Sequence, residues 1–179
     1  PRWASQRELL KLGVPIGVTM LFEVTSFTFM AVLIARLGAV AVAGHQIVAN
    51  LVALLFMVPL SLGIASSVLV AQSLGYGSRD LARAAVRHGF TMALSVALVA
   101  AAGLLIFREQ IVGLYTRDAA VARTALGLLG LVALFHVLDA TQGVATFVLR
   151  GYRRTFWPMV IYGVALWALG LGGGAWIAF

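Results

Sequence analysis

The sequence predicts an all-α integral membrane protein, a bundle of about five transmembrane helices. Hydrophobic residues fill 62% of its 179 positions, charged residues only 11%, and the mean hydropathy is +1.02. Soluble domains carry about 25% charged residues. The second observation is a set of long runs almost without charge, because a helix needs about 20 apolar residues to cross a bilayer. These runs cover residues 12–35, 47–72, 89–107, 124–149 and 155–179.

The first two runs differ in how clearly they are bounded. Residues 12–35 contain Glu23 as their only charge. Residues 37–78 contain no charge at all, but this segment is too long for one crossing. Its first part, "AVAGHQIVAN", is richer in small and polar residues. We therefore place that part at the membrane interface and the span at 47–72.

The other three runs are simpler. Residues 89–107 and 155–179 are free of charge, and Asp139 is the only charge in residues 124–149. Strands of a membrane barrel would alternate between lipid-facing and lumen-facing residues, and these continuous apolar runs do not alternate. Helices are therefore expected throughout.

The lysines and arginines predict the orientation, because cytoplasmic loops keep an excess of them. One side would hold nine: Arg2, Arg7, Lys11, Arg79, Arg83, Arg87, Arg150, Arg153 and Arg154. The other side would hold four: Arg36, Arg108, Arg117 and Arg123. We expect the amino-terminal end of this chain in the cytoplasm. Nucleic-acid binding is a weak interpretation of the net charge of +7, since the arginines are spread over separate loops.

The ends and the missing motifs indicate the class of protein. The chain starts "PRWASQ" without Met and stops within the fifth run at "GGGAWIAF", so we expect a piece of a larger membrane protein. It contains no metal-ligand cluster, no G-x-S-x-G elbow and no GxxxxGK[ST] motif. We therefore predict neither an enzyme nor a bound cofactor.

Two carboxylates inside apolar runs are the main functional signal. An ionisable group at the bilayer centre costs about 2.5 to 3.5 kcal/mol. Glu23 lies about 18 Å along a helix from Lys11, and Asp139 lies about 16 Å from Arg150, at 1.5 Å per residue. Because the two helices would run in opposite directions, both carboxylates are expected at one level near the middle of the membrane. Transporters place their ion sites there.

Polar and aromatic neighbours accompany both acids. Residues three and four apart share a helix face, so each acid is expected to belong to a stripe that faces a cavity. The neighbours are Thr19, Ser26 and Phe27 beside Glu23, and Phe135, His136 and Gln142 beside Asp139.

These residues also have structural interpretations. Glu23 or Asp139 could be a protonated acid that is hydrogen-bonded inside the bundle. His136 could pack or form a hydrogen bond rather than relay protons. Gln46 either satisfies backbone groups near the outer interface or contacts the substrate. Asn50 either lines the same cavity or joins neighbouring helices. Phe27 and Phe135 either contact lipid and neighbouring helices or offer π faces to a cationic ligand.

Several motifs in order also carry a family resemblance. They are "FEVT", "AGHQIVAN", "FMVPLSLGIA", "LFREQIVGLYT", "LDATQGV" and "LRGYRR". In this order and spacing they resemble the carboxy-terminal half of NorM-type multidrug exporters of the MATE (multidrug and toxic compound extrusion) family. The chain would correspond to helices seven to eleven of a twelve-helix transporter, with the amino-terminal half as its missing partner.

The resemblance implies a bacterial inner-membrane antiporter that exports cationic or amphiphilic drugs in exchange for Na⁺ or H⁺. The glutamate and aspartate at Glu23 and Asp139 would contribute to the cation site. One departure leaves the ion open: some relatives have Tyr where this chain has Phe135, which keeps a π face and loses a hydroxyl ligand.

Three other functions stay open at this point. A related exporter of lipid-linked sugars would need a large cationic cavity rather than an acidic pair. An intramembrane enzyme would need a nucleophile or metal set beside the acids. A membrane subunit that transports nothing would need neither.

Overall fold

The computed structural model describes residues 3–178, which form helices joined by short turns. The predicted all-α class is confirmed. Arg2 and Phe179, which belonged to the predicted flank and fifth run, lie outside the described residues. The elements are α1 (Trp3–Ala35), α2 (Ala39–Gly75), α3 (Arg79–Ile106), α4 (Arg108–Tyr115), α5 (Ala119–Gly151), α6 (Phe156–Tyr162), the π-helix η1 (Gly163–Gly173) and α7 (Gly174–Ala178).

Five helical segments of the described residues are long and apolar enough to cross a membrane, as predicted. They are Ser5–Ala35, Ala39–Gly75, Arg79–Ile106, Ala119–Gly151 and Phe156–Trp176. Most extend beyond the predicted runs because backbone hydrogen bonding continues past the last apolar residue. The short α4 has no counterpart among the predicted elements. It begins with Arg108 and Glu109 and is too short for a charge-free run to reveal it.

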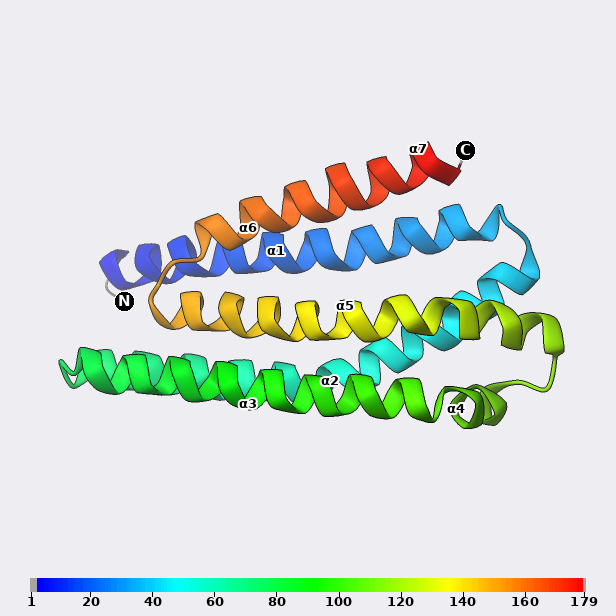
Figure 1. Cartoon of the computed structure of the whole chain (residues 1–179). Coiled ribbons are helices and arrows are strands. Elements are labelled where there is room, and N and C mark those ends of the chain that lie inside the picture. The colour runs from blue at the N-terminus through cyan, green and yellow to red at the C-terminus, as the bar shows by residue number, and fades with distance from the viewer. Residues whose placement is uncertain (1–2, 179) are drawn as a thin grey trace.

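The long helices lie side by side and alternate in direction (Figure 1). The start of α1, the α2–α3 turn and the α5–α6 turn are at one end, which we call the basic end. The cations predicted on the cytoplasmic side lie at this end, as far as the structure describes them. They belong to the first turns of α1 and α3, the last turn of α5 and the turn that follows it. The α1–α2 turn and α4 are at the opposite end.

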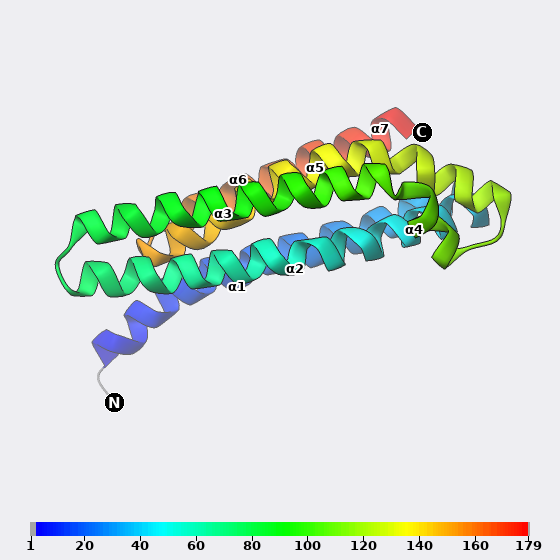
Figure 2. The same ribbon diagram turned by 60° about the horizontal axis from the view of Figure 1, so that its bottom comes forward.

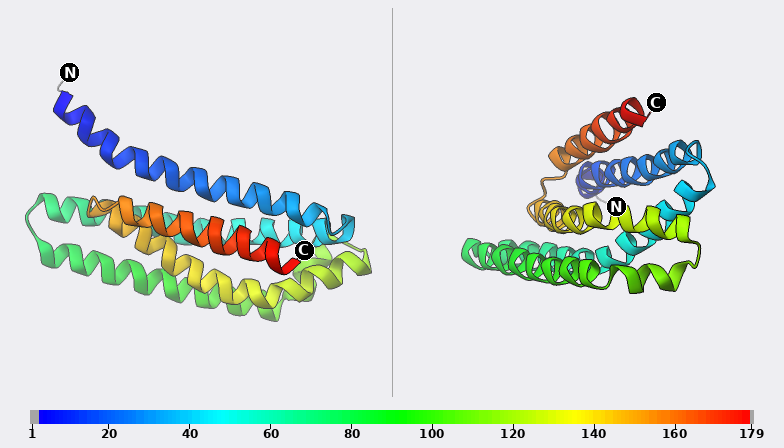
Figure 3. Two further views of the ribbon diagram at one scale, coloured as in Figure 1. Left: turned by 90° about the horizontal axis from the view of Figure 1, so that it is seen from above. Right: turned by 45° about the vertical axis from the view of Figure 1, so that its right-hand side comes forward.

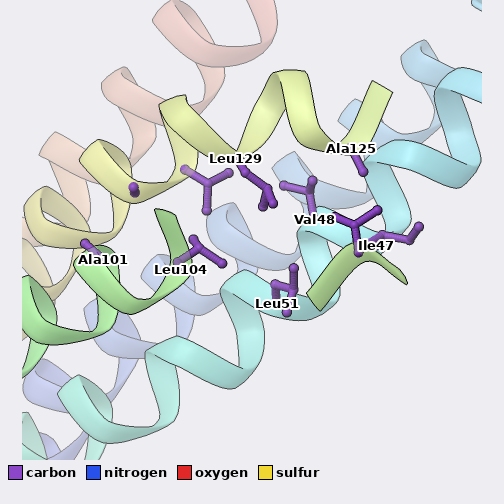
Figure 4. Packing of buried hydrophobic residues seen from close by; sticks show 10 residues of the cluster. Ile47, Val48, Leu51, Ala101, Leu104, Ala125 and Leu129 are labelled. Atoms are coloured by element: carbon purple, nitrogen blue, oxygen red, sulfur yellow. The ribbon is translucent and has the colours of Figure 1, made fainter. Parts of the chain in front are cut away.

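Helices α2, α3 and α5 pack into a three-helix group. Their core includes Val48, Leu51, Leu104 and Leu129, each at most 8% exposed (Figure 4). Small residues let the helices approach closely, as is common in membrane bundles. At Gly151, for example, an added Cβ would lie 2.8 Å from the backbone oxygen of Ser67.

A second group is formed by α1 and the continuous segment α6–η1–α7. Trp167 of η1 donates a hydrogen bond from Nε1 to the carbonyl of Phe22, 3.3 Å away, and its ring lies 5.6 Å from that of Phe29. Figure 3 shows this pair of helices lying along the three-helix group. The amino-terminal part of α1 leans away from the other helices in both Figures 2 and 3.

Two turns at the basic end have the same hydrogen bonds and different residues. After α2, the amides of Tyr76, Gly77 and Ser78 donate to the carbonyls of residues 72, 74 and 73. After α5, those of Tyr152, Arg153 and Arg154 donate to residues 148, 150 and 149. The second of these three residues is left-handed in both turns, with φ of 76° at Gly77 and 60° at Arg153. Glycine suits this position, and an arginine there is strained.

Candidate cation site

Glu23 is half-buried on α1, on the side that faces the three-helix group. Its neighbours Thr19 and Ser26 are 2% and 5% exposed. Their hydroxyls donate to carbonyls of their own helix, Thr19 to Pro15 at 2.7 Å and Ser26 to Glu23 at 2.9 Å. Such bonds satisfy a hydroxyl inside an apolar helix without another element. The hydroxyl oxygens therefore remain possible acceptors, while their protons are already used.

Asp139 is half-buried on α5 and interacts electrostatically with Glu23. The two acids come from different helix groups, so their carboxylates interact across the boundary between the groups. Glu23 also interacts with Arg150, nearer the basic end of α5. The structure therefore brings two negative charges together and places one positive charge on the same side of α5.

Tyr162 is a member of this cluster that the sequence interpretation missed. Its side chain lies close to those of Thr146 and Gln142, and it interacts electrostatically with both carboxylates. The Thr146 hydroxyl donates to the Gln142 carbonyl at 3.0 Å, so its oxygen can accept from Tyr162. One signal was present: Tyr162 carries the only hydroxyl in residues 156–179. A lone hydroxyl in an apolar span needs a partner.

The remaining predicted contacts divide between the cluster and other places. Gln142 lies close to Tyr162. Phe27 and Phe135 lie next to the acids along their helices, but their side chains are 54% and 45% exposed and point outward from this chain. Gln46 is exposed near the start of α2. Asn50 accepts a hydrogen bond from the Tyr115 hydroxyl at 2.7 Å, which ties α4 to α2.

His136 occupies the packed side of α5. It is 1% exposed, and neither ring nitrogen has a hydrogen-bond partner among the described residues. It lies seven residues before Gly143, whose Cα faces the Phe56 ring of α2, so both belong to the same helix face. The electrostatic partners of Asp139 are Glu23 and Tyr162, and His136 is not among them. This placement favours packing over proton relay.

We expect His136→Leu to raise the free energy of unfolding by about 1 to 2 kcal/mol, because it removes two buried polar atoms without partners and keeps a similar volume. Thermal unfolding of the full-length protein in detergent measures this. The exposed His88 provides the control, since His88→Leu removes no buried polar atom. Loss of transport in His136→Leu with normal folding would instead favour the relay.

The donor set of the cluster is oxygen-rich and small. The described residues hold no group of three or more His, Cys, Asp or Glu side chains that could bind a metal. A monovalent cation could instead use two carboxylates and neutral oxygens of Tyr162, Gln142 and Thr146. Hard cations prefer such oxygens. A proton would need only one of the carboxylates.

Comparison with known proteins agrees with this architecture. The MatE family model matches residues 15–176. The chain is 48% identical to the "Probable multidrug resistance protein NorM" of Aromatoleum aromaticum, covering 100% of this chain and 39% of that protein. It is 39% identical to the "Multidrug resistance protein MdtK" of Edwardsiella ictaluri (98% and 38% covered) and 41% identical to that of Pectobacterium atrosepticum (99% and 39%).

These names describe multidrug resistance. The chain spans about two fifths of the length of these relatives. A family model that matches nearly the whole chain, together with five apolar helices, identifies an integral membrane protein. The chain belongs to the MATE family.

Proposed function

We propose that the protein containing this chain is an antiporter that exports cationic or amphiphilic drugs in exchange for Na⁺ or H⁺. It would act in the bacterial inner membrane with the basic end in the cytoplasm. The missing amino-terminal half would supply the other wall of the drug cavity. The relatives' names support drug export, and the excess of cations at the basic end supports the orientation.

The observation that carries this proposal is the interaction of Glu23 with Asp139 between the two helix groups. Two like charges in a medium of low dielectric repel each other strongly. An entering Na⁺ or proton removes part of that repulsion, and so does a bound cationic drug. Drug and coupling ion therefore compete for the same negative charge.

Exchange follows when this competition is linked to a change of conformation. A ligand shifts the equilibrium between inward-facing and outward-facing states only by its different affinity for the two. If the outward-facing state holds the coupling ion more tightly, ion binding there drives release of the drug. Tyr162 would hold Gln142 and Thr146 in place beside the acids, so that their oxygens meet the arriving ion.

Drug transport in vesicles with separately imposed Na⁺ and proton gradients tests the proposal. We expect reconstituted full-length protein to move a cationic dye against one of these gradients. Vesicles with both gradients collapsed provide the baseline. Dye movement that neither gradient changes would contradict coupling, and absence of movement in every condition would favour a subunit that transports nothing.

A further inference from the structure

A pocket at the basic end carries positive charge that the proposed transport cycle does not use. It lies between the first turns of α1 and the α5–α6 turn and has a volume of about 360 Å³. Its charged lining is Glu8, Lys11, Arg153 and Arg154, with Thr155 and Trp157 beside them. Three cations face one carboxylate there. We call this the cationic pocket.

Glu8 does not neutralise the whole pocket. Its carboxylate forms an ion pair with Arg153, and both side chains are more than half exposed. This pair joins α1 to the α5–α6 turn. Glu8 is the only carboxylate among the described lining residues, so no carboxylate of the lining balances the charges of Lys11 and Arg154. The pocket therefore has a net charge of +2, from three cations and one anion, and suits an anionic group.

The backbone gives an independent reason to assign a role to Arg153. It adopts the left-handed conformation at the position where the equivalent turn after α2 has Gly77. A glycine would remove the strain and still complete the same hydrogen bonds. Strain that persists in a folded protein points to a function for the side chain. Here the side chain is a guanidinium that lines the cationic pocket.

The level of the pocket identifies the source of the anion. The spans on either side of it begin at Ser5 and Phe156, so the pocket lies where the apolar helices meet the polar boundary of the membrane. Trp157 is 65% exposed beside it, and exposed tryptophans are enriched at the headgroup level. Phosphates of anionic lipids are the abundant anions at that level, and Lys and Arg bind them well.

We propose that the cationic pocket binds the phosphate group of an anionic phospholipid in the leaflet at the basic end. Arg153 and Arg154 would present guanidinium donors to the phosphate oxygens, and Lys11 would add a point charge from α1. The bound lipid would join α1 to the α5–α6 turn, next to the Glu8–Arg153 ion pair. This site is separate from Glu23 and Asp139, and its test does not depend on transport.

The test uses the full-length protein in detergent and measures binding of a fluorescent phosphatidylglycerol, with phosphatidylcholine as the neutral comparison. We expect preference for phosphatidylglycerol. Each neighbouring cation contributes about fivefold to the affinity. Lys11→Gln with Arg154→Gln should therefore weaken binding by about 25-fold. The matched control is Arg108→Gln with Arg117→Gln at the opposite end, which should leave the affinity unchanged.

Two single variants make the test independent of misfolding. Arg153→Gly should weaken binding about fivefold and leave thermal stability equal or higher, because glycine relieves the left-handed strain. Glu8→Gln should strengthen binding, because it removes the carboxylate that competes for Arg153. Unchanged affinity in the Lys11 and Arg154 double variant would overturn the proposal. So would displacement of the lipid by millimolar inorganic phosphate, which would identify a site for free phosphate.

Discussion

Glu23→Gln and Asp139→Asn, each made in the full-length transporter, are expected to abolish ion-driven drug efflux while the protein still inserts and folds. Both changes keep the size of the side chain and remove its charge. The two acids repel each other, so each variant loses its attraction for the bound cation, and loss of one member of a desolvated pair of opposite charges costs about 2 to 5 kcal/mol. We therefore expect the initial rate of gradient-driven dye transport to fall by about 30-fold or more.

Matched variants separate loss of the site from a general effect of removing acids. Glu109→Gln and Asp80→Asn make the same chemical changes at exposed positions on α4 and α3, and they should retain efflux. Tyr162→Phe removes one hydroxyl and leaves both carboxylates, so a reduction of about threefold to tenfold is expected. Undiminished efflux in both Glu23→Gln and Asp139→Asn would reject the proposed cation site.

Gly151→Ala is expected to destabilise the protein by about 1 to 3 kcal/mol, the usual cost of overpacking. The new methyl group would lie 2.8 Å from the Ser67 carbonyl oxygen and 3.1 Å from Val70. A backbone oxygen inside α2 cannot move aside as a flexible side chain can. Separation of α2 from α5 is the remaining way to relieve the contact, and it would open the three-helix group.

Thermal unfolding of the full-length protein in one detergent measures this effect. Gly103→Ala is the control, because it lies inside α3 and an added Cβ there meets no atom within 4 Å. In a helix interior that change should be neutral or stabilise by up to about 1 kcal/mol. Equal melting temperatures for the two variants would show that α2 and α5 are not closely packed at Gly151.

Hydropathy was sufficient to predict the number of spanning helices, because each must hide its backbone in about 20 apolar residues. It could not predict which helices pack together. In a bilayer a lipid-facing surface and a buried surface are equally apolar, so the sequence does not distinguish them. For the same reason α2, α3 and α5 could not be recognised as one group from their composition.

The acids and their partners were predictable to different degrees. Glu23 and Asp139 were noticeable because charge in an apolar run is costly. Their interaction across one boundary depends on how α1 packs against α5, which the sequence does not reveal. The position of Tyr162 beside them depends on the packing of a third helix, α6. Asn50 shows the opposite case: its polar side chain suggested a cavity, whereas the structure gives it a partner, Tyr115, that is 65 residues away in the chain.

The π-helical winding of η1 decides which way two aromatic residues point. In an α-helix, residues five apart are turned by about 140° from each other. With i to i+5 hydrogen bonding this angle is much smaller, because each residue turns the helix by less than it does in an α-helix. Tyr162, at the start of this stretch, meets Gln142 and Thr146, and Trp167, five residues on, meets Phe22. If η1 returned to ordinary α winding, either Tyr162 or Trp167 would rotate away from its partner. The pitch of this helix therefore determines whether the hydroxyl and the indole can both face their partners.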